Sequence, residues 1–179
     1  MNRLYHRRKD PHPERGTNLA KTEVVFGIVI RPDGNILIIQ DSPVKGSRRR
    51  WSTSDSKYKT PGGKVVKDRR AKDSIQYKIR KETDVSSIHL MAGKPFFVIE
   101  VKDHLVVSFY LMGYIQGEPA PNKGIKFANF LPPGEVKKKI EKGEFLENHQ
   151  LALEKYLRGD FSEDHQDALE KYLGNPTSY

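Results

Sequence analysis

The sequence predicts an α/β (α+β) fold in which strands and helices share one core. Three features predict it. Two continuous apolar runs, residues 24–30 and 36–40, have the character of buried strands. Residues 69–82 carry a narrow apolar stripe at helical spacing, which is typical of a helix packed on a sheet. Residues 149–173 repeat a short helical pattern. A chain of 179 residues fits one domain with extensions.

The N-terminal part of the chain predicts an arm followed by two strands. Residues 1–20 are polar, contain two prolines and show no periodicity, so we predict a flexible basic arm. Ordered structure is expected to begin near Thr22. Residues 32–34 (Pro-Asp-Gly) are a turn signal between strand 24–30 and strand 36–40. The two strands are therefore predicted to form a hairpin.

A long basic segment, residues 42–57, separates this hairpin from a Pro-Gly-Gly turn at 61–63. Loops of this length in compact domains are usually functional or disordered. The helix at 69–82 follows the turn. Further along, apolar runs predict strands at 95–101 and 105–115.

The C-terminal tail contains an internal duplication. His149–Leu157 recurs sixteen residues later as His165–Leu173, with eight of nine positions identical. Each copy predicts a short helix, with Gly159 placed to end the first and Ser162 placed to cap the second. We expect the first copy to pack on the domain and the second to pack beside it or on another subunit, as a possible homodimer. The two histidines lack further ligands at metal spacing, so no metal site is predicted there.

The Pro-Gly-Gly turn and its helix match a known spacing. With Gly63 as the first glycine, the pattern Gly-x5-Glu-x7-Arg-Glu-U-x-Glu-Glu-x-Gly-U fits without a gap, where U is bulky and aliphatic. Ile79, Glu82 and Val85 occupy matching positions. This pattern resembles the Nudix box. An aromatic segment at 127–131, followed by Pro-Pro-Gly-Glu, also resembles the Nudix domain, so the resemblance covers about residues 22–142.

The resemblance implies a fold and an activity. It implies a Nudix-like mixed sheet sandwiched between helices over residues 21–143, with the basic insert 42–57 and a helical C-terminal extension at 144–179. Members of the Nudix hydrolase superfamily cleave nucleoside diphosphates linked to another group. They use Mg²⁺ held by carboxylates of the box.

Most acidic positions of the box hold other residues. Arg69 stands at the first Glu, Lys78 at the second, Lys81 at the third, and Glu82 alone remains, while Asp84 replaces the late glycine. Positions 78, 81 and 82 share one face of a helix. These cations, with only one carboxylate among them, should repel a divalent ion, which prefers several carboxylate oxygens. We therefore predict a degenerate box with no metal and no cofactor.

The same cations suit an anion directly, with no metal between. The glycines let backbone amides approach an anion closely, although the turn itself needs them as well. The predicted phosphate- or ligand-binding residues are Gly62, Gly63, Arg69, Lys78 and Lys81. Two alternatives stay open. The side chains of the box are simply solvated, or Mg²⁺ catalysis survives with ligands from elsewhere, in which case Glu82 and Glu100 are the catalytic candidates.

Basic charge is concentrated in the N-terminal half. The net charge is +9, whereas residues 143–179 hold three basic and eight acidic residues. This asymmetry indicates a polyanion partner, or an acidic tail folded over a basic surface. Within the insert, Arg48, Arg49, Arg50 and Trp51 have the character of a site that binds phosphates and stacks a base. The alternative is that Trp51 packs on the domain. The predicted ligand is a nucleotide or a single-stranded nucleic acid.

The composition excludes several classes of protein. There is no cysteine, which excludes disulfides and thiolate zinc sites. No apolar run approaches the length of a membrane helix, and the charged N-terminus is not a secretory signal. We expect a cytoplasmic protein. The favoured function is non-catalytic, regulatory binding of a nucleotide or nucleic acid such as RNA. The alternative is a hydrolase of a nucleoside diphosphate derivative with displaced metal ligands.

Overall fold

The computed structural model describes residues 21–43, 57–102, 104–122 and 124–174. Within these ranges the chain forms eight strands and four helices. The strands are β1 (Thr22–Ile30), β2 (Ile36–Asp41), β3 (Tyr58–Lys59), β4 (Gly62–Lys64), β5 (Ser87–Leu90), β6 (Phe97–Lys102), β7 (Leu105–Gln116) and β8 (Ile125–Leu131). The helices are α1 (Ala71–Thr83), α2 (Pro133–Glu141), α3 (Glu147–Arg158) and α4 (Glu163–Gly174).

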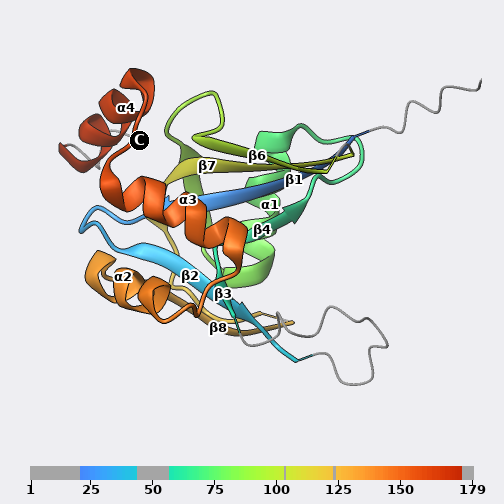
Figure 1. Ribbon diagram of the computed structural model, residues 1–179, viewed down its shortest axis with the longest axis horizontal. Coiled ribbons are helices and arrows are strands. Elements are labelled where there is room, and N and C mark those ends of the chain that lie inside the picture. Colours follow the sequence, from blue (N-terminus) through green and yellow to red (C-terminus); the bar gives the residue numbers. More distant parts are fainter. Residues whose placement is uncertain (1–20, 44–56, 103, 123, 175–179) are drawn as a thin grey trace, which may run out of the picture.

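The strands form one mixed sheet (Figure 1). Its main order is β3-β2-β1-β7-β5, with β4 paired to β1, β6 to β7 and β8 to β2. The central strands β1 and β7 run parallel, from Thr22 beside Leu105 to Ile30 beside Gly113. Because both faces of these strands are covered, their sequences are apolar almost throughout rather than alternating.

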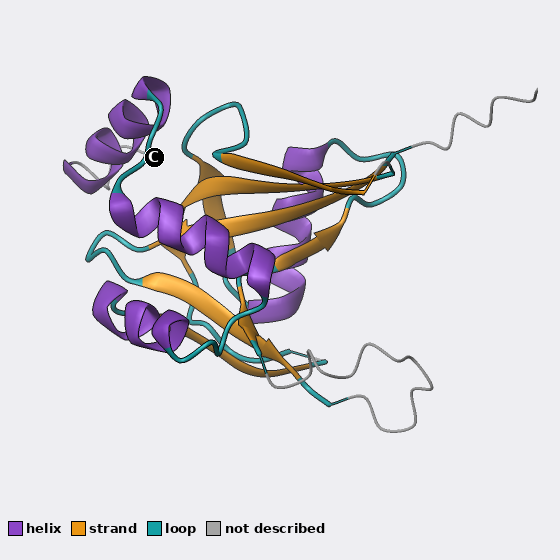
Figure 2. Cartoon of the chain, in the orientation of Figure 1, coloured by secondary structure: helices purple, strands orange, loops and turns teal. Residues whose placement is uncertain are grey.

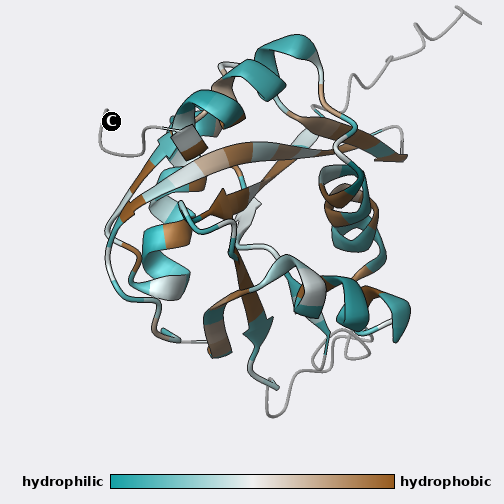
Figure 3. Cartoon of the chain, turned by 90° about the vertical axis from the view of Figure 1, so that its left-hand side faces the viewer, coloured by the Kyte–Doolittle hydropathy of each residue, from teal (hydrophilic) through white to brown (hydrophobic). Residues whose placement is uncertain are grey.

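Helices cover both faces of the sheet (Figure 2). On one face, Ile75 of α1 packs with Val25 and Val29. On the other face, Ile28 belongs to a cluster that includes Leu153 of α3. Figure 3 shows apolar colour along much of the strands and a mixture of polar and apolar colour along the helices. The predicted α+β sandwich is confirmed.

The predicted hairpin is right at its turn and wrong in its extent. The N–H of Gly34 donates to the carbonyl of Arg31 at 2.8 Å, which closes the turn. However, β1 and β2 pair only at Ile30 and Ile36. Beyond that point each strand has a longer partner, β7 for β1 and β8 for β2. The apolar runs indicate buried strands but carry no information about which distant strand lies beside them.

Both copies of the repeat are helical, as predicted. Gly159, with φ of 74°, ends α3 in the left-handed region. The carbonyl of Ser162 accepts the first bonds of α4, from the N–H groups of His165 and Gln166. The second copy packs on the same domain, because Leu169 is buried in the cluster on the α3 face. A homodimer through the tail stays a prediction. Within the described ranges, no helix has the length and apolar character needed to cross a membrane.

Tyr172 attaches α4 to the sheet. Its hydroxyl lies 2.9 Å from the carbonyl oxygen of Ile30 and 2.8 Å from that of Tyr114, near the ends of β1 and β7. We expect Tyr172→Phe to lower the free energy of unfolding by about 1–2 kcal/mol, because buried carbonyls lose a donor. Urea unfolding measures this change. The control is Tyr156→Phe, at the equivalent place in the first copy. Equal losses in the two variants would show that the Tyr172 hydroxyl has no special role.

Candidate functional site

The Pro-Gly-Gly turn brings β4 directly against β1. Gly62 lies beside Phe26, and Gly63 beside Val25. The two glycines have φ of 145° and 155°, a region that side chains disfavour. A Cβ on Gly62 would stand 2.2 Å from the carbonyl oxygen of Val25. Glycine is therefore required at position 62 by the close approach of the two strands as well as by its backbone angle.

Glu82 connects α1 to this turn. Its Oε2 accepts a hydrogen bond of 2.9 Å from the N–H of Gly62. Burial raises the pKa of the Glu82 carboxyl, while the charge of Lys59 and the Gly62 hydrogen bond oppose that rise. The one acidic residue left in the box is thus a half-buried group that is hydrogen-bonded to the turn.

Two cations and a second carboxylate surround Glu82. Lys59 Nζ lies 2.8 Å from Asp41 Oδ2. The charge of Asp41 adds to the upward pKa shift of Glu82, and the charge of Lys78 reduces it. Lys78 Nζ also lies 3.8 Å from the position that a Cβ on Gly63 would take. The turn is therefore flanked by two ammonium groups and two carboxylates.

The predicted cationic residues fall into two groups. Lys78 lies at the Pro-Gly-Gly turn, as described above. Arg69 instead lies over the ring of Tyr77, with its Cζ 4.5 Å from the ring centroid. Lys81 Nζ lies 5.9 Å from the same centroid. Tyr77 is 40% exposed, so this second group faces solvent on the outer side of α1. Helical spacing predicted that Lys78 and Lys81 share one face of the helix. It did not show that Lys78 lies near Gly63 while Lys81 lies near Tyr77.

The remaining predicted residues lie elsewhere. Glu100 is exposed on β6, and its Oε1 lies 3.4 Å from Lys21 Nζ. The groups that shift the pKa of Glu82 are Lys59, Gly62, Asp41 and Lys78, and Glu100 is not among them. The basic stretch Arg48, Arg49, Arg50 and Trp51 lies outside the described residues.

The residues at the box do not fit a Mg²⁺ ion. Such an ion requires several oxygen ligands, usually carboxylates. In the described part of the chain, no three residues among His, Cys, Asp and Glu lie together as a metal-holding group. Asp41 is paired with Lys59, and Glu82 accepts from Gly62.

An apolar cavity of about 500 Å³ opens on the α3 face of the sheet, next to the turn. Its walls come from β1, β6, β7 and the start of α3, and are Val24, Phe26, Val101, Leu105, Val107, Leu146, Glu147, Asn148 and His149. Val24 and Phe26 pair with Lys64 and Gly62 of β4. The volume is in the range of small-molecule sites. The sequence did not reveal the cavity, because its walls come from segments far apart in the chain.

His149 lies in the wall of this cavity and behind the turn. Its Nδ1 accepts a hydrogen bond of 3.1 Å from the N–H of Thr60, and the Thr60 hydroxyl lies 2.9 Å away. Because an N–H can only donate, the neutral ring carries its proton on Nε2. Phe26 and Phe109 contact the ring edge-on. Burial, with the charge of Lys59, lowers the pKa of His149 to about 3. His149 is thus a neutral hydrogen-bonding residue.

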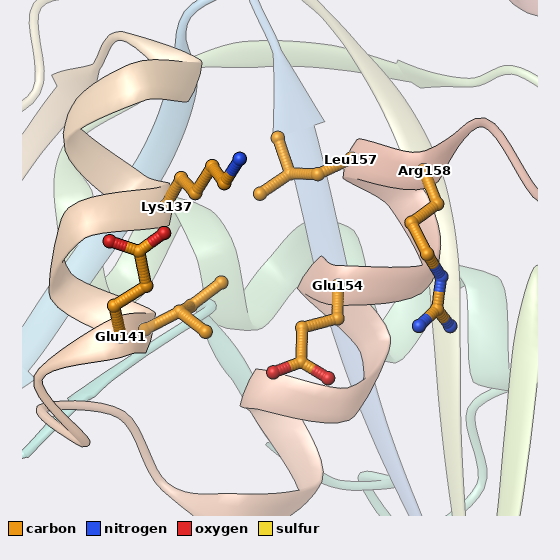
Figure 4. Close-up of a pocket in the computed structure, with 6 residues that line it drawn as sticks. Lys137, Glu141, Glu154, Leu157 and Arg158 are labelled. Carbon is orange, nitrogen blue, oxygen red and sulfur yellow. The ribbon is translucent and has the colours of Figure 1, made fainter.

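A second groove, of about 260 Å³, lies between α2 and α3 (Figure 4). Lys137 and Glu141 of α2 face Glu154, Leu157 and Arg158 of α3 across it. Its charges are mixed and mostly exposed, and it lies away from the Pro-Gly-Gly turn. The walls of the cavity beside His149 are instead mainly apolar.

Solved structures with a similar fold are Nudix proteins. A MutT protein from Methanosarcina mazei Go1 superposes with a TM-score of 0.59 at 15% identity, over 80% of this chain and 97% of that one. A Nudix hydrolase from Nitrosomonas europaea gives 0.59 at 13% identity, over 79% and 91%. An ADP-ribose pyrophosphatase from Streptococcus suis 89-1591 gives 0.54 at 16% identity, over 80% and 95%. No protein-family model and no curated protein matches the sequence. The chain has the Nudix hydrolase fold, as its sequence resemblance implied.

Proposed function

We propose that the protein binds a nucleotide or nucleotide derivative, in a regulatory role and without Mg²⁺-dependent cleavage at the box. The observation that carries this proposal is the hydrogen bond that Glu82 accepts from the turn. The one remaining carboxylate of the box is half-buried and accepts the Gly62 N–H, while Lys78 lies against Gly63. A site of this kind favours an anion over a divalent cation.

The cavity beside the turn supplies a place for the ring of such a ligand. Phe26 offers an aromatic wall, and Val24 and Val107 offer apolar walls. His149 also lines the cavity, and its neutral ring carries its proton on Nε2. Val24 in the cavity wall pairs with Lys64 of β4, so a ring in this cavity would leave its phosphate groups near Lys64.

The alternative is a hydrolase of a nucleoside diphosphate derivative. It is favoured by the names of the proteins with similar folds, which include an ADP-ribose pyrophosphatase. In this case Mg²⁺ would need ligands from outside the box, with Glu82 and Glu100 as the acidic candidates. The two functions differ in their need for Mg²⁺.

Thermal unfolding with a panel of nucleoside mono-, di- and triphosphates and ADP-ribose separates them, with each compound tested in EDTA and in Mg²⁺. We expect a ligand from the panel to raise Tm in EDTA, since a ligand at 100 times its Kd stabilises by about 2.7 kcal/mol. We expect no turnover of the same compounds. A shift that requires Mg²⁺, or turnover on the order of 1 per second, would support the hydrolase instead.

A cavity-filling variant tests the location of the site. Val101 lines the cavity and is 39% exposed, so a larger side chain fits at its mouth without opening the core. We expect Val101→Trp to weaken binding of the stabilising nucleotide at least tenfold, or about 1.4 kcal/mol, in isothermal titration. The matched control is Val98→Trp, on the same strand, 47% exposed and not part of the cavity wall. Equal affinity in both variants would place the ligand elsewhere.

A further inference from the structure

The outer face of α1 carries an exposed aromatic residue among cations. Within the described ranges, Tyr77 is the only Phe, Tyr or Trp side chain that is exposed. Residues 64–81 hold eight basic and two acidic residues. One of the two acids, Asp73, is already paired with Arg70 at 2.8 Å. The net charge around Tyr77 is therefore strongly positive.

Helical geometry places this charge around the ring. Arg80 and Lys81 stand three and four residues after Tyr77, so they lie on the same face one turn further along. Arg80, Lys81 and Arg69 are all exposed. Arg69 covers the ring at 4.5 Å, and Lys81 Nζ lies at 5.9 Å. Held together without a ligand, these like charges repel one another, and a polyanion would relieve that repulsion.

We propose that this outer face of α1, formed by Arg69, Tyr77, Arg80 and Lys81, binds single-stranded nucleic acid, with Tyr77 stacking a base and the cations contacting phosphates. A groove or stripe of cations around an aromatic ring is the arrangement that binds single strands without sequence preference. The proposal does not depend on the nucleotide cavity, which lies on the opposite face of the sheet, beside the start of α3.

An anionic membrane surface is the other polyanion that a basic helix can bind. Helices that lie on membranes bury an apolar face in the lipid. The apolar residues of α1, Ile75 and Ile79, are instead fully buried against the sheet. The outward face offers one amphipathic ring and no aliphatic side chain to insert. The observations therefore favour nucleic acid.

Fluorescence anisotropy of labelled oligo-dT and oligo-rU of about 20 nucleotides, with the full chain, tests the proposal. We expect binding that weakens steeply from about 50 mM to about 200 mM salt. Tyr77→Ala should weaken it about tenfold, and Tyr77→Phe should retain it, because the ring stacks and the hydroxyl does not. Far-UV circular dichroism and Tm check that each variant is folded.

A charge-matched pair separates this surface from general electrostatics. Arg80→Glu with Lys81→Glu should abolish most binding. Lys137→Glu with Lys138→Glu makes the same change in net charge on exposed residues of α2 and should leave most binding intact. Equal losses in the two doubles, unchanged binding by Tyr77→Ala, or binding to anionic phosphatidylserine vesicles but not to either oligonucleotide would overturn the proposal.

Discussion

Lowering the pH from about 7.5 to about 4.5 is expected to cost the folded protein about 2.5 kcal/mol through His149 alone. The folded-state pKa of His149 is about 3, below its ordinary value of 6.5. Between these two values the unfolded chain binds a proton that the folded chain does not. The contribution of His149 to the free energy of unfolding is therefore complete above the unfolded pKa and falls as the pH drops toward the folded pKa.

Urea unfolding across this pH range measures the effect, and His149→Asn isolates it. Asparagine keeps an acceptor for the Thr60 N–H but does not titrate. Burial also lowers the pKa of His89, which adds to the loss at low pH. The raised pKa of Glu82 acts in the opposite direction, because protonation relieves its burial cost. If the variant lost stability with the same slope as the parent, the neutral His149 described above would be wrong.

The second large effect is expected at Gly62. Gly62→Ala should lower the free energy of unfolding by about 3 kcal/mol or more, from backbone strain and overpacking together. The new Cβ would stand 2.2 Å from the Val25 carbonyl and 2.7 Å from the Cα of Phe26, and both are backbone atoms that cannot move aside. Urea unfolding at neutral pH measures the loss.

Gly63→Ala is the matched control for this change. Gly63 has a similar φ of 155°, but its Cβ would meet only the flexible end of Lys78, at 3.8 Å. Backbone strain alone then predicts a loss of about 1–2 kcal/mol. A Gly62→Ala variant no less stable than Gly63→Ala would mean that β4 can move away from β1.

Local patterns predicted the elements that local forces determine. The apolar runs located β1, β2 and β7, and the box spacing located α1 and the turn before it. Asp84 takes the left-handed conformation, with φ of 56°, where the box pattern has glycine. An acidic residue tolerates this conformation well enough to end the helix there. The helix therefore ends where the box pattern predicts, although the glycine is replaced by Asp84.

Contacts between distant segments could not be predicted from the sequence. The four residues of β5 are too few to show a period, and they become a strand only because β7 lies beside them. His149 was weighed only as a metal ligand, because nothing near it indicates Thr60, 89 residues earlier. The exposure of Tyr77 could not be predicted either, because it depends on how α1 lies on the sheet.

The contacts of Tyr172 also set an order of events during synthesis. The hydroxyl of Tyr172 reaches the carbonyl of Ile30 across 142 positions of the chain. The parallel partner of β1 begins at Leu105, beside Thr22. The ribosome therefore releases β1 long before β7 and α4, which pack against it. Until then the apolar β1 segment is exposed to solvent and to other chains, and the native core closes only once α4 has left the exit tunnel.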